Sequence, residues 1–162
     1  DYYWNGLTRT MDKEGIVQLL SDSKNEALDE IEVLNVYVPS DDERAFQFYK
    51  QMEGNLPLKV VKLHEVITPD YVRSINNAAG ILSLKLVESK GEINGLPFVV
   101  PGGRFNELYG WDSYFEAIGL LLDGRLDLAK AMAEHFQYEI ENYGKILNAN
   151  RSNYLTSTQP PF

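Results

Sequence analysis

The sequence predicts a mainly α-helical chain with short β-strands in its first half. Near the end of the chain, two segments with helical apolar periodicity are separated by only a few residues, which is typical of an antiparallel helical hairpin. Upstream, the short apolar runs 33–38 and 58–63 are rich in valine and border prolines, as strands often do. The glycine- and proline-rich stretch 91–106 between these regions predicts irregular structure.

Helices are expected around the two strands. The aliphatic residues within 15–22 predict a short helix, and residues 40–42 (Ser-Asp-Asp) offer N-cap oxygens to a second helix. Apolar side chains at helical spacing continue that second helix over residues 45–52, and Gly54 is expected to stop it.

A third helix is expected to start at residues 68–70. This Thr-Pro-Asp triplet combines a capping hydroxyl, a proline in the first turn and an acid near the positive end of the helix dipole. Gly80 is expected to close this helix, and the apolar run 81–87 that follows fits either a strand or a helix.

The first helix of the hairpin is expected to be capped by Asp112 or Ser113 and to end at Asp123-Gly124. Ser113 and Glu116 have the spacing of a capping box. Apolar side chains occur on most sides of this segment, so the sequence predicts a helix that is buried almost all round.

The second helix of the hairpin is predicted over residues 126–143. It is amphipathic, and Gly144 stands where a left-handed C-terminal glycine belongs. Its expected apolar stripe consists of Leu128, Met132, Phe136, Ile140 and Tyr143.

Composition excludes several function classes. The 162 residues carry a net charge of −9, and an acidic chain is repelled by phosphate backbones, so no nucleic-acid partner is expected. No apolar run is long enough to span a membrane. The absence of cysteine excludes disulfides and thiolate metal sites. His64 and His135 lie far apart, and the acidic run 22–32 lacks the glycine of a calcium loop, so no metal site is expected.

The segment PGGRFNELYGWDSY, residues 101–114, has a composition suited to a sugar pocket. Aromatic rings offer flat faces to sugar C–H edges, and Arg104 with a carboxylate offers donors and acceptors to neighbouring hydroxyls. The glycines allow the backbone to approach a ligand closely. The alternative is that the aromatic side chains only anchor the loop and that Arg104 pairs with Glu107.

A second polar segment, NANRSNYLTSTQPPF, forms residues 148–162. Its amides and hydroxyls are natural partners for sugar hydroxyls. Its composition equally fits a solvated surface loop, and residues 150–152 form a glycosylation triplet that often arises by chance.

The first polar segment resembles the signature of the trehalases, with every characteristic position filled. GKILNANRSNYL followed by QPPF resembles the trehalase substrate loop, and VYVP and ITPDYVRSINN are most similar to the cytosolic neutral trehalases. The resemblance runs from about residue 33 to the end and implies a cytoplasmic protein. It also implies an (α/α)6 toroid, with residues 1–96 as a leader and 97–162 as the first signature loop and the start of the barrel. A toroid needs at least roughly 200 residues, so this chain would be an N-terminal part of one.

The resemblance also implies a set of substrate-binding residues. Arg104 would bind glucose hydroxyls at the catalytic subsite and Phe105 would wall it. The full set is Arg104, Phe105, Trp111, Asp112, Asn148 and Gln159. Ser157 and Thr158 depart from the arginine-serine pair that many trehalases carry before that glutamine, and Asn153 stands where tyrosine is usual.

The implied reaction is the hydrolysis of α,α-trehalose to two glucoses with inversion. Inversion needs two carboxyl groups about 6.5–9.5 Å apart, and in trehalases both belong to later parts of the chain, so no catalytic residue is expected here. The expected partners are trehalose or glucose and the remainder of the catalytic domain. No cofactor is expected, although calcium could act through a separate regulatory region. The alternative, favoured by Ser157, is a non-catalytic sugar-binding or regulatory module of the same family.

Overall fold

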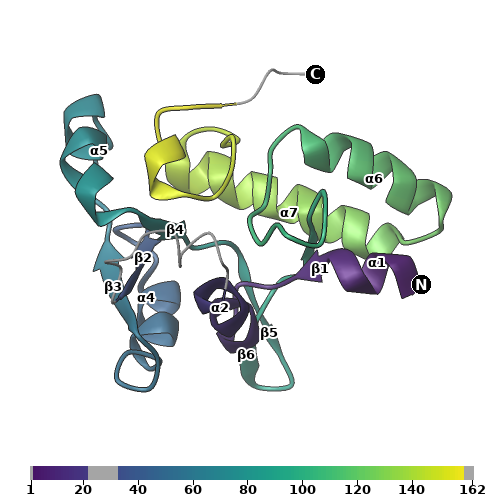
Figure 1. Ribbon diagram of the computed structural model, residues 1–162, viewed down its shortest axis with the longest axis horizontal. Helices are drawn as coiled ribbons and strands as arrows, with labels where there is room; N and C mark the ends of the chain where they lie inside the picture. The colour runs from purple at the N-terminus through teal and green to yellow at the C-terminus, as the bar shows by residue number, and fades with distance from the viewer. Residues whose placement is uncertain (1, 22–32, 159–162) are drawn as a thin grey trace.

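The computed structural model describes residues 2–21 and 33–158, and it joins a small parallel sheet to a helical hairpin (Figure 1). The sheet has the strand order β3-β2-β4, with β2 at Leu34–Val38, β3 at Leu58–Lys62 and β4 at Gly80–Leu82. Helix α4 (Glu43–Lys50) connects β2 to β3, and α5 (Pro69–Ile75) lies between β3 and β4. Both predicted strands are confirmed, and their parallel pairing follows from the helical crossovers between them.

The predicted starts of these two helices are confirmed. The side chain of Asp42 accepts a hydrogen bond from the Ala45 amide at 2.9 Å. Thr68 Oγ1 accepts one from the Tyr71 amide at 3.1 Å, and Pro69 stands in the first turn of α5. Each cap satisfies a backbone donor that has no partner inside the helix.

The role predicted for Gly80 is wrong. A short 3₁₀ turn, η1 (Asn76–Ala78), follows α5, and Gly80 begins β4 opposite Asn35 of β2. A side chain here would place its Cβ 2.2 Å from the Asn35 carbonyl oxygen, so the close strand pairing requires glycine.

Several further short strands lie in regions that the sequence left undecided or predicted to be irregular, and another lies before residue 10, where no element was predicted. Strand β5 (Leu86–Ser89) pairs antiparallel with β6 (Glu92–Gly95), and β1 (Thr8–Arg9) pairs antiparallel with β7 (Phe98–Val99). Positive φ angles of 56° at Lys90 and 80° at Gly91 give the two-residue turn that this twisted hairpin needs. Glycine and proline therefore limit strand length in residues 91–106 without preventing pairing.

Two helices precede the sheet. Helix α1 covers Tyr2–Leu7 and was not predicted, whereas α2, at Lys13–Leu20, overlaps the helix expected over 15–22. Helix α2 starts earlier than expected because the Asp12 side chain accepts hydrogen bonds from the Glu14 and Gly15 amides. The acidic run 22–32 lies outside the described residues.

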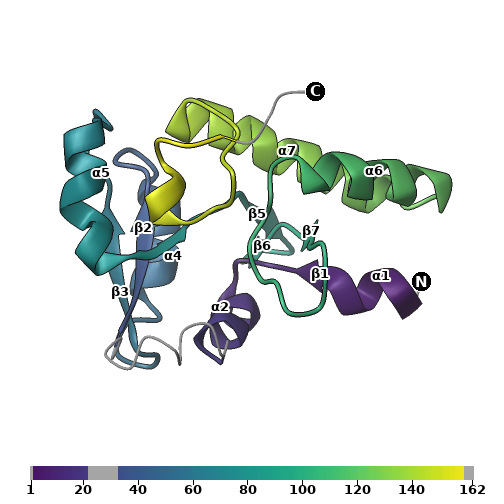
Figure 2. The same ribbon diagram turned by 45° about the horizontal axis from the view of Figure 1, so that its top comes forward.

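The helical hairpin is confirmed. Helices α6 (Asp112–Leu122) and α7 (Leu126–Tyr143) lie side by side in Figures 1 and 2 and run antiparallel. Gly124 has a φ of 72° in the connection, and Gly144 has the predicted left-handed conformation with a φ of 77°. Of the predicted stripe on α7, Ile140 is 52% exposed and thus does not belong to the core.

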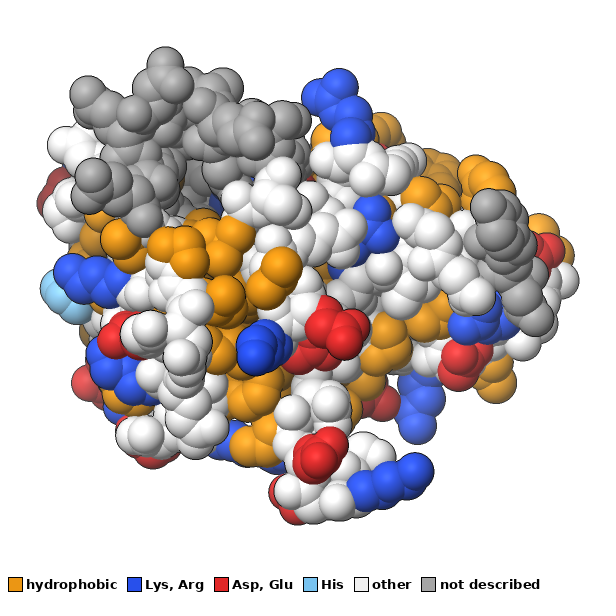
Figure 3. Space-filling view, turned by 60° about the horizontal axis from the view of Figure 1, so that its bottom comes forward, with side chains coloured by type: hydrophobic (Ala, Val, Ile, Leu, Met, Phe, Trp, Pro, Cys, Tyr) orange, Lys and Arg blue, Asp and Glu red, His pale blue; other side chains and the backbone are white. Residues whose placement is uncertain are grey.

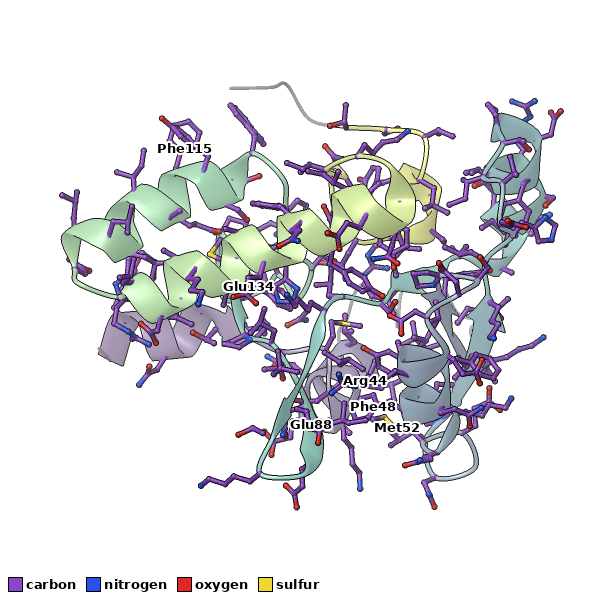
Figure 4. The ribbon with its side chains drawn as sticks, turned by 180° about the vertical axis from the view of Figure 1, so that it is seen from behind. Arg44, Phe48, Met52, Glu88, Phe115 and Glu134 are labelled. Atoms are coloured by element: carbon purple, nitrogen blue, oxygen red, sulfur yellow. The ribbon has the colours of Figure 1, made fainter. Side chains whose placement is uncertain are left out.

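Two expectations for α6 are wrong. Trp111 stands at the N-cap, where its indole has no oxygen to accept from the first backbone amides, and Ser113 lies inside the helix with its Oγ donating to the Tyr109 carbonyl at 2.6 Å. The helix is also not buried all round: Phe115 is 53% and Leu122 is 82% exposed. Figure 4 shows Phe115 pointing away from α7, which covers only the opposite side of α6.

The hydrophobic core occupies both sides of the parallel sheet. On one side Val36 packs with α2, α4 and the first half of α7, and on the other Tyr37 packs with α5 and the C-terminal end of α7.

An ion pair at the surface connects the β5–β6 hairpin to α4. It joins Arg44 and Glu88, which are 3.7 Å apart (Figure 4). On the face in Figure 3, Lys and Arg side chains alternate with Asp and Glu around a hydrophobic band. In the part of the chain that the structure describes, none of the helices is long and apolar enough to cross a bilayer.

Candidate functional site

The fold brings the two polar segments identified from the sequence into direct contact. Tyr109 and Ala149 form an isolated antiparallel bridge. Beside it, the Gly110 amide donates to the Asn148 carbonyl at 3.2 Å. Trp111 and Asp112 follow Gly110 directly, so their main chain lies close to that of Asn148. Arg104 and Phe105 lie further back on the same loop.

Asn150 holds the second segment against the sheet. Its side chain is fully buried: Oδ1 accepts from the Leu108 amide at 2.8 Å, and Nδ2 donates to the Leu82 carbonyl at 3.0 Å. Its main-chain oxygen accepts from the Leu82 amide at 2.8 Å, and Ser152 Oγ accepts from the Gly80 amide at 3.0 Å. The alternative of a solvated surface loop is therefore wrong for this part of the segment.

A buried ion pair joins the two segments a second time. Glu107 Oε1 accepts from Arg151 Nε at 2.7 Å and from a second guanidinium nitrogen of the same residue. Glu107 Oε2 accepts from the Asn106 amide at 3.1 Å and from the Tyr109 hydroxyl at 3.4 Å. The suggested pairing of Arg104 with Glu107 is thus wrong, because the fold presents Arg151 to this carboxylate instead.

The same environment suppresses ionisation of Tyr109. Burial, followed by the charge of Glu107, raises the pKa of Tyr109 to about 12, so its hydroxyl stays protonated and donates to Glu107. Because both oxygens of Glu107 accept hydrogen bonds, this carboxylate is suited to holding the loop and not to delivering a proton.

The first polar segment, residues 101–114, is called the signature loop from here on. Arg104 is exposed on this loop. Its guanidinium carbon stands 5.3 Å from the centre of the Phe105 ring, a cation–π distance. The Phe105 amide donates to the Gly102 carbonyl at 2.9 Å, and this hydrogen bond closes a tight turn over residues 102–105. Arg104 therefore presents a positive charge beside an aromatic face.

Trp111 and Asp112 begin α6 at the opposite end of the loop. The indole of Trp111 is 40% exposed and meets the Phe115 ring edge-on, with their centres 5.7 Å apart. Asp112 is half-buried in the first turn. One turn further, burial and then the nearby charge of Asp112 raise the pKa of Glu116 to about 8. The start of α6 thus combines an aromatic face with two neighbouring carboxyl groups.

Asn148 is half-buried at the start of the second segment. Its main-chain N–H donates to the Ser157 carbonyl at 3.4 Å. This contact folds residues 148–157 back on themselves. Gln159, the last of the expected sugar-binding residues, lies outside the described residues.

Two buried titratable groups of α7 lie behind the loops. Glu139 Oε2 accepts from the Leu147 amide at 3.1 Å, and burial raises the pKa of Glu139 to about 8. His135 is fully buried, with Nδ1 accepting from the Lys85 amide at 3.3 Å and Nε2 lying 3.0 Å from the Leu96 carbonyl. Burial lowers the pKa of His135 to about 4, so it is a neutral core residue. Within residues 2–21 and 33–158, no cluster of His, Asp and Glu side chains is arranged to hold a metal ion.

Sequence reasoning missed the residues that support the two loops, namely Arg9, Glu139, Asn150 and Arg151. Arg9 comes from β1, and its side chain reaches Gly103 and Asn106 on the signature loop. Arg151 was visible as a charge within an otherwise neutral segment, which was the only signal for it. Nothing in the sequence indicated that Arg9 lies beside residues almost a hundred positions later.

Aromatic faces, a surface guanidinium and amide groups on adjoining loops are chemically suited to sugar hydroxyls and C–H edges. The comparisons with known proteins place the chain in a family of glycosidases. The chain belongs to the trehalase family, whose model matches residues 1–162.

Curated relatives match the chain over its whole length. It is 48% identical over 174 residues to a cytosolic neutral trehalase of Beauveria bassiana, covering 100% of this chain and 23% of that protein. It is 47% identical over 171 residues to a cytosolic neutral trehalase of Saccharomyces cerevisiae, covering 99% of this chain and 22% of that protein. The chain therefore spans less than a quarter of the length of these relatives.

A solved structure has the same fold. The neutral trehalase Nth1 from Saccharomyces cerevisiae superposes with a TM-score of 0.82 at 44% sequence identity. The match covers 99% of this chain and 30% of that chain. The packing of sheet, hairpin and loops described above is thus an arrangement found within a trehalase.

Proposed function

We propose that this chain is the N-terminal part of the catalytic domain of a cytoplasmic trehalase that hydrolyses α,α-trehalose to two glucose molecules with inversion. In this proposal residues 1–96 form a leader, and residues 97–162 carry the first signature loop and begin an (α/α)6 toroid. Membership of the trehalase family and the cytosolic trehalases among the relatives support it.

One observation supports the proposed site. The signature loop, residues 101–114, and the second polar segment, residues 148–162, which we call the amide-rich segment, are joined main chain to main chain at Tyr109 and Ala149. The join brings the main chain that leads into Trp111 and Asp112 close to that of Asn148, although more than thirty residues separate them in sequence. A pocket for a small polyol needs a few polar groups that converge from different segments beside apolar faces. The adjoining loops supply both.

The proposed roles follow from the chemistry of each group. Arg104 donates to glucose hydroxyls at the catalytic subsite and Phe105 forms its wall. Trp111 offers a ring face to the sugar, and Asp112 accepts from hydroxyls, as a carboxylate does strongly. Asn148 contributes an amide, and we propose the same for Gln159.

The proton transfers belong to the remainder of the domain. An inverting glycosidase places one carboxylic acid on the glycosidic oxygen and one carboxylate on the attacking water. This chain supplies binding energy that orients the glucose ring between them. Hydrogen bonds that Asp112 accepts and Arg104 donates lower the barrier if they strengthen in the transition state, whereas equally strong ground-state bonds would only lower KM.

The test uses the full-length protein and measures glucose release from trehalose. We expect Arg104→Ala and Asp112→Ala each to lower kcat/KM at least about a hundredfold, because each removes a charge-assisted contact to the sugar. The matched control is Arg73→Ala on α5, an exposed arginine that pairs with Asp70, and it should leave the kinetics unchanged.

Near-native kinetics in either loop variant, with circular dichroism showing an intact fold, would remove that residue from the site. A full-length native protein that binds trehalose but releases no glucose would instead favour a non-catalytic sugar-binding module.

A further inference from the structure

Arg9 is a buried cation at the end of β1. Only 7% of this residue is exposed. It has the geometry to act on the signature loop, because β1 pairs with β7, the strand that leads into that loop. In sequence, Arg9 is far from every residue so far assigned to the sugar site, because it belongs to the leader.

The guanidinium of Arg9 bridges two parts of the chain. Nη1 donates to the carbonyls of Gly6 at 3.1 Å and Thr8 at 2.9 Å, which belong to the same N-terminal segment as Arg9. Nη2 donates to the Gly103 carbonyl at 3.1 Å, and Nε donates to Asn106 Oδ1 at 2.9 Å, both on the signature loop. The planar fork of arginine makes these contacts simultaneously, which a lysine ammonium cannot reproduce.

All four of these acceptors are neutral groups. Burial lowers the pKa of Arg9, which reflects the cost of placing its charge away from water. An apolar side chain at this position would leave all four acceptors without this donor, so the four hydrogen bonds offset the cost of burying the charge. The fork geometry, which reaches these acceptors at the same time, therefore accounts for an arginine at this position.

The two loop acceptors stand on either side of Arg104 and Phe105. Gly103 immediately precedes this pair and Asn106 immediately follows it, so a single rigid group holds both ends of the segment. A side chain at Gly103 would meet no atom within 4 Å, so packing around this glycine does not restrain the loop. Two adjacent glycines make the backbone permissive, and an external restraint is needed to define it.

We propose that Arg9 is a positioning residue that fixes Arg104 and Phe105 for glucose binding. This inference rests on the proposed function of the loop. Arg9 touches no sugar in this proposal: it acts by holding the Gly103 carbonyl and the Asn106 side chain. A displacement of about 1 Å at Arg104 is enough to weaken catalysis strongly.

The test is a double-mutant cycle in the full-length protein with trehalose as substrate. Arg9→Lys is expected to raise KM and to lower kcat/KM by about tenfold or more. In the Arg104→Ala background the same change should lower kcat/KM by less than about twofold, because the residue to be positioned is gone. Arg73→Lys, at an exposed arginine on α5, is the matched control and should have no effect.

A second variant and a second readout guard against misfolding. Asn106→Ala removes one loop acceptor while leaving Arg9 its three carbonyl partners, and it should reproduce the kinetic effect of Arg9→Lys without adding to it. Hydrogen exchange at the amides of residues 103–106 should accelerate in both variants and not in Arg73→Lys.

The outcomes separate this inference from the function on which it rests. If Arg9→Lys lowers kcat/KM by the same factor with and without Arg104, or leaves KM and loop exchange unchanged, Arg9 is only a structural residue and the inference fails. If the native protein releases no glucose from trehalose, the proposed function itself fails, and the positioning role fails with it.

Discussion

Glu139 is a buried carboxyl group that contacts the main chain at the start of the amide-rich segment. Its Oε2 accepts from the Leu147 amide at 3.1 Å, immediately before Asn148. Only 1% of the residue is exposed, so ionisation inside the fold is costly. Burial accordingly raises the pKa of Glu139 to about 8, against 4.5 for an ordinary glutamate. The carboxyl group is therefore mostly protonated in the folded protein at neutral pH.

This pKa predicts a pH-dependent loss of stability. Between pH 4.5 and about 8 the unfolded chain releases the Glu139 proton while the folded chain keeps it, so rising pH favours unfolding. Glu139→Gln replaces the group with a neutral one that can still accept from Leu147. We expect the thermal midpoint of the variant, relative to the native protein, to increase steadily from pH 5 to pH 8.

The measurement is the melting temperature of the full-length protein across this pH range. Glu141→Gln, at an exposed position on the same helix, is the control and should give a constant difference. A constant difference for Glu139→Gln as well would contradict the raised pKa.

Between elements, the most consequential interaction is the ion pair of Glu107 with Arg151, which connects the signature loop to the amide-rich segment. The side chain of Glu107 is 1% exposed and that of Arg151 is 23% exposed. Charge pairs at the surface contribute little, whereas removing one partner of a buried pair leaves an uncompensated charge. The pair thus makes the two loops depend on each other for their conformation.

Arg151→Ala is expected to lower the free energy of unfolding by about 3–5 kcal/mol, because Glu107 would remain buried without its cation. Arg73→Ala, which breaks an exposed pair with Asp70, should lower it by at most about 1 kcal/mol. Urea denaturation of the full-length protein, followed by fluorescence, measures both values. Equal and small losses in the two variants would mean that water screens the Glu107 charge.

At the scale of the whole molecule, the outer face of α6 indicates that more of the domain packs here. Several of its apolar residues are exposed: Tyr114, Phe115, Ile118, Leu121 and Leu122. Contiguous apolar surface of this kind is unusual on an isolated domain and marks an interaction site. Because the chain spans less than a quarter of its curated relatives, the remainder of the domain is the partner we propose for this face.

The 162-residue piece on its own is therefore expected to self-associate. Leu121→Glu with Leu122→Glu should reduce this association, because both side chains are more than half exposed on α6. Val66→Glu, an exposed apolar position outside α6, is the control. Sedimentation velocity measures the change, and a monodisperse native piece with sharp two-state melting would refute the expectation.

Local rules were sufficient for much of the fold. The caps at Asp42 and Thr68, the left-handed Gly144 and the strands at residues 34–38 and 58–62 were all predictable from the sequence. Each depends on side chains within a few positions of the backbone groups that they satisfy. The signature loop was recognisable for the same reason, since its characteristic residues are consecutive.

The tertiary structure alone decided how the two loops are held. Arg9 reaches a loop 94 positions away, and Asn150 bonds to a strand 68 positions away. The tertiary structure also decided which arginine pairs with Glu107 and which side of α6 is covered. These outcomes depend on contacts between distant segments, whose free energies come from burial and from the entropy of closing long loops. The sequence by itself determined which side chains the proposed site contains, and packing determined their neighbours, because a neighbour across the fold leaves no local pattern in the chain.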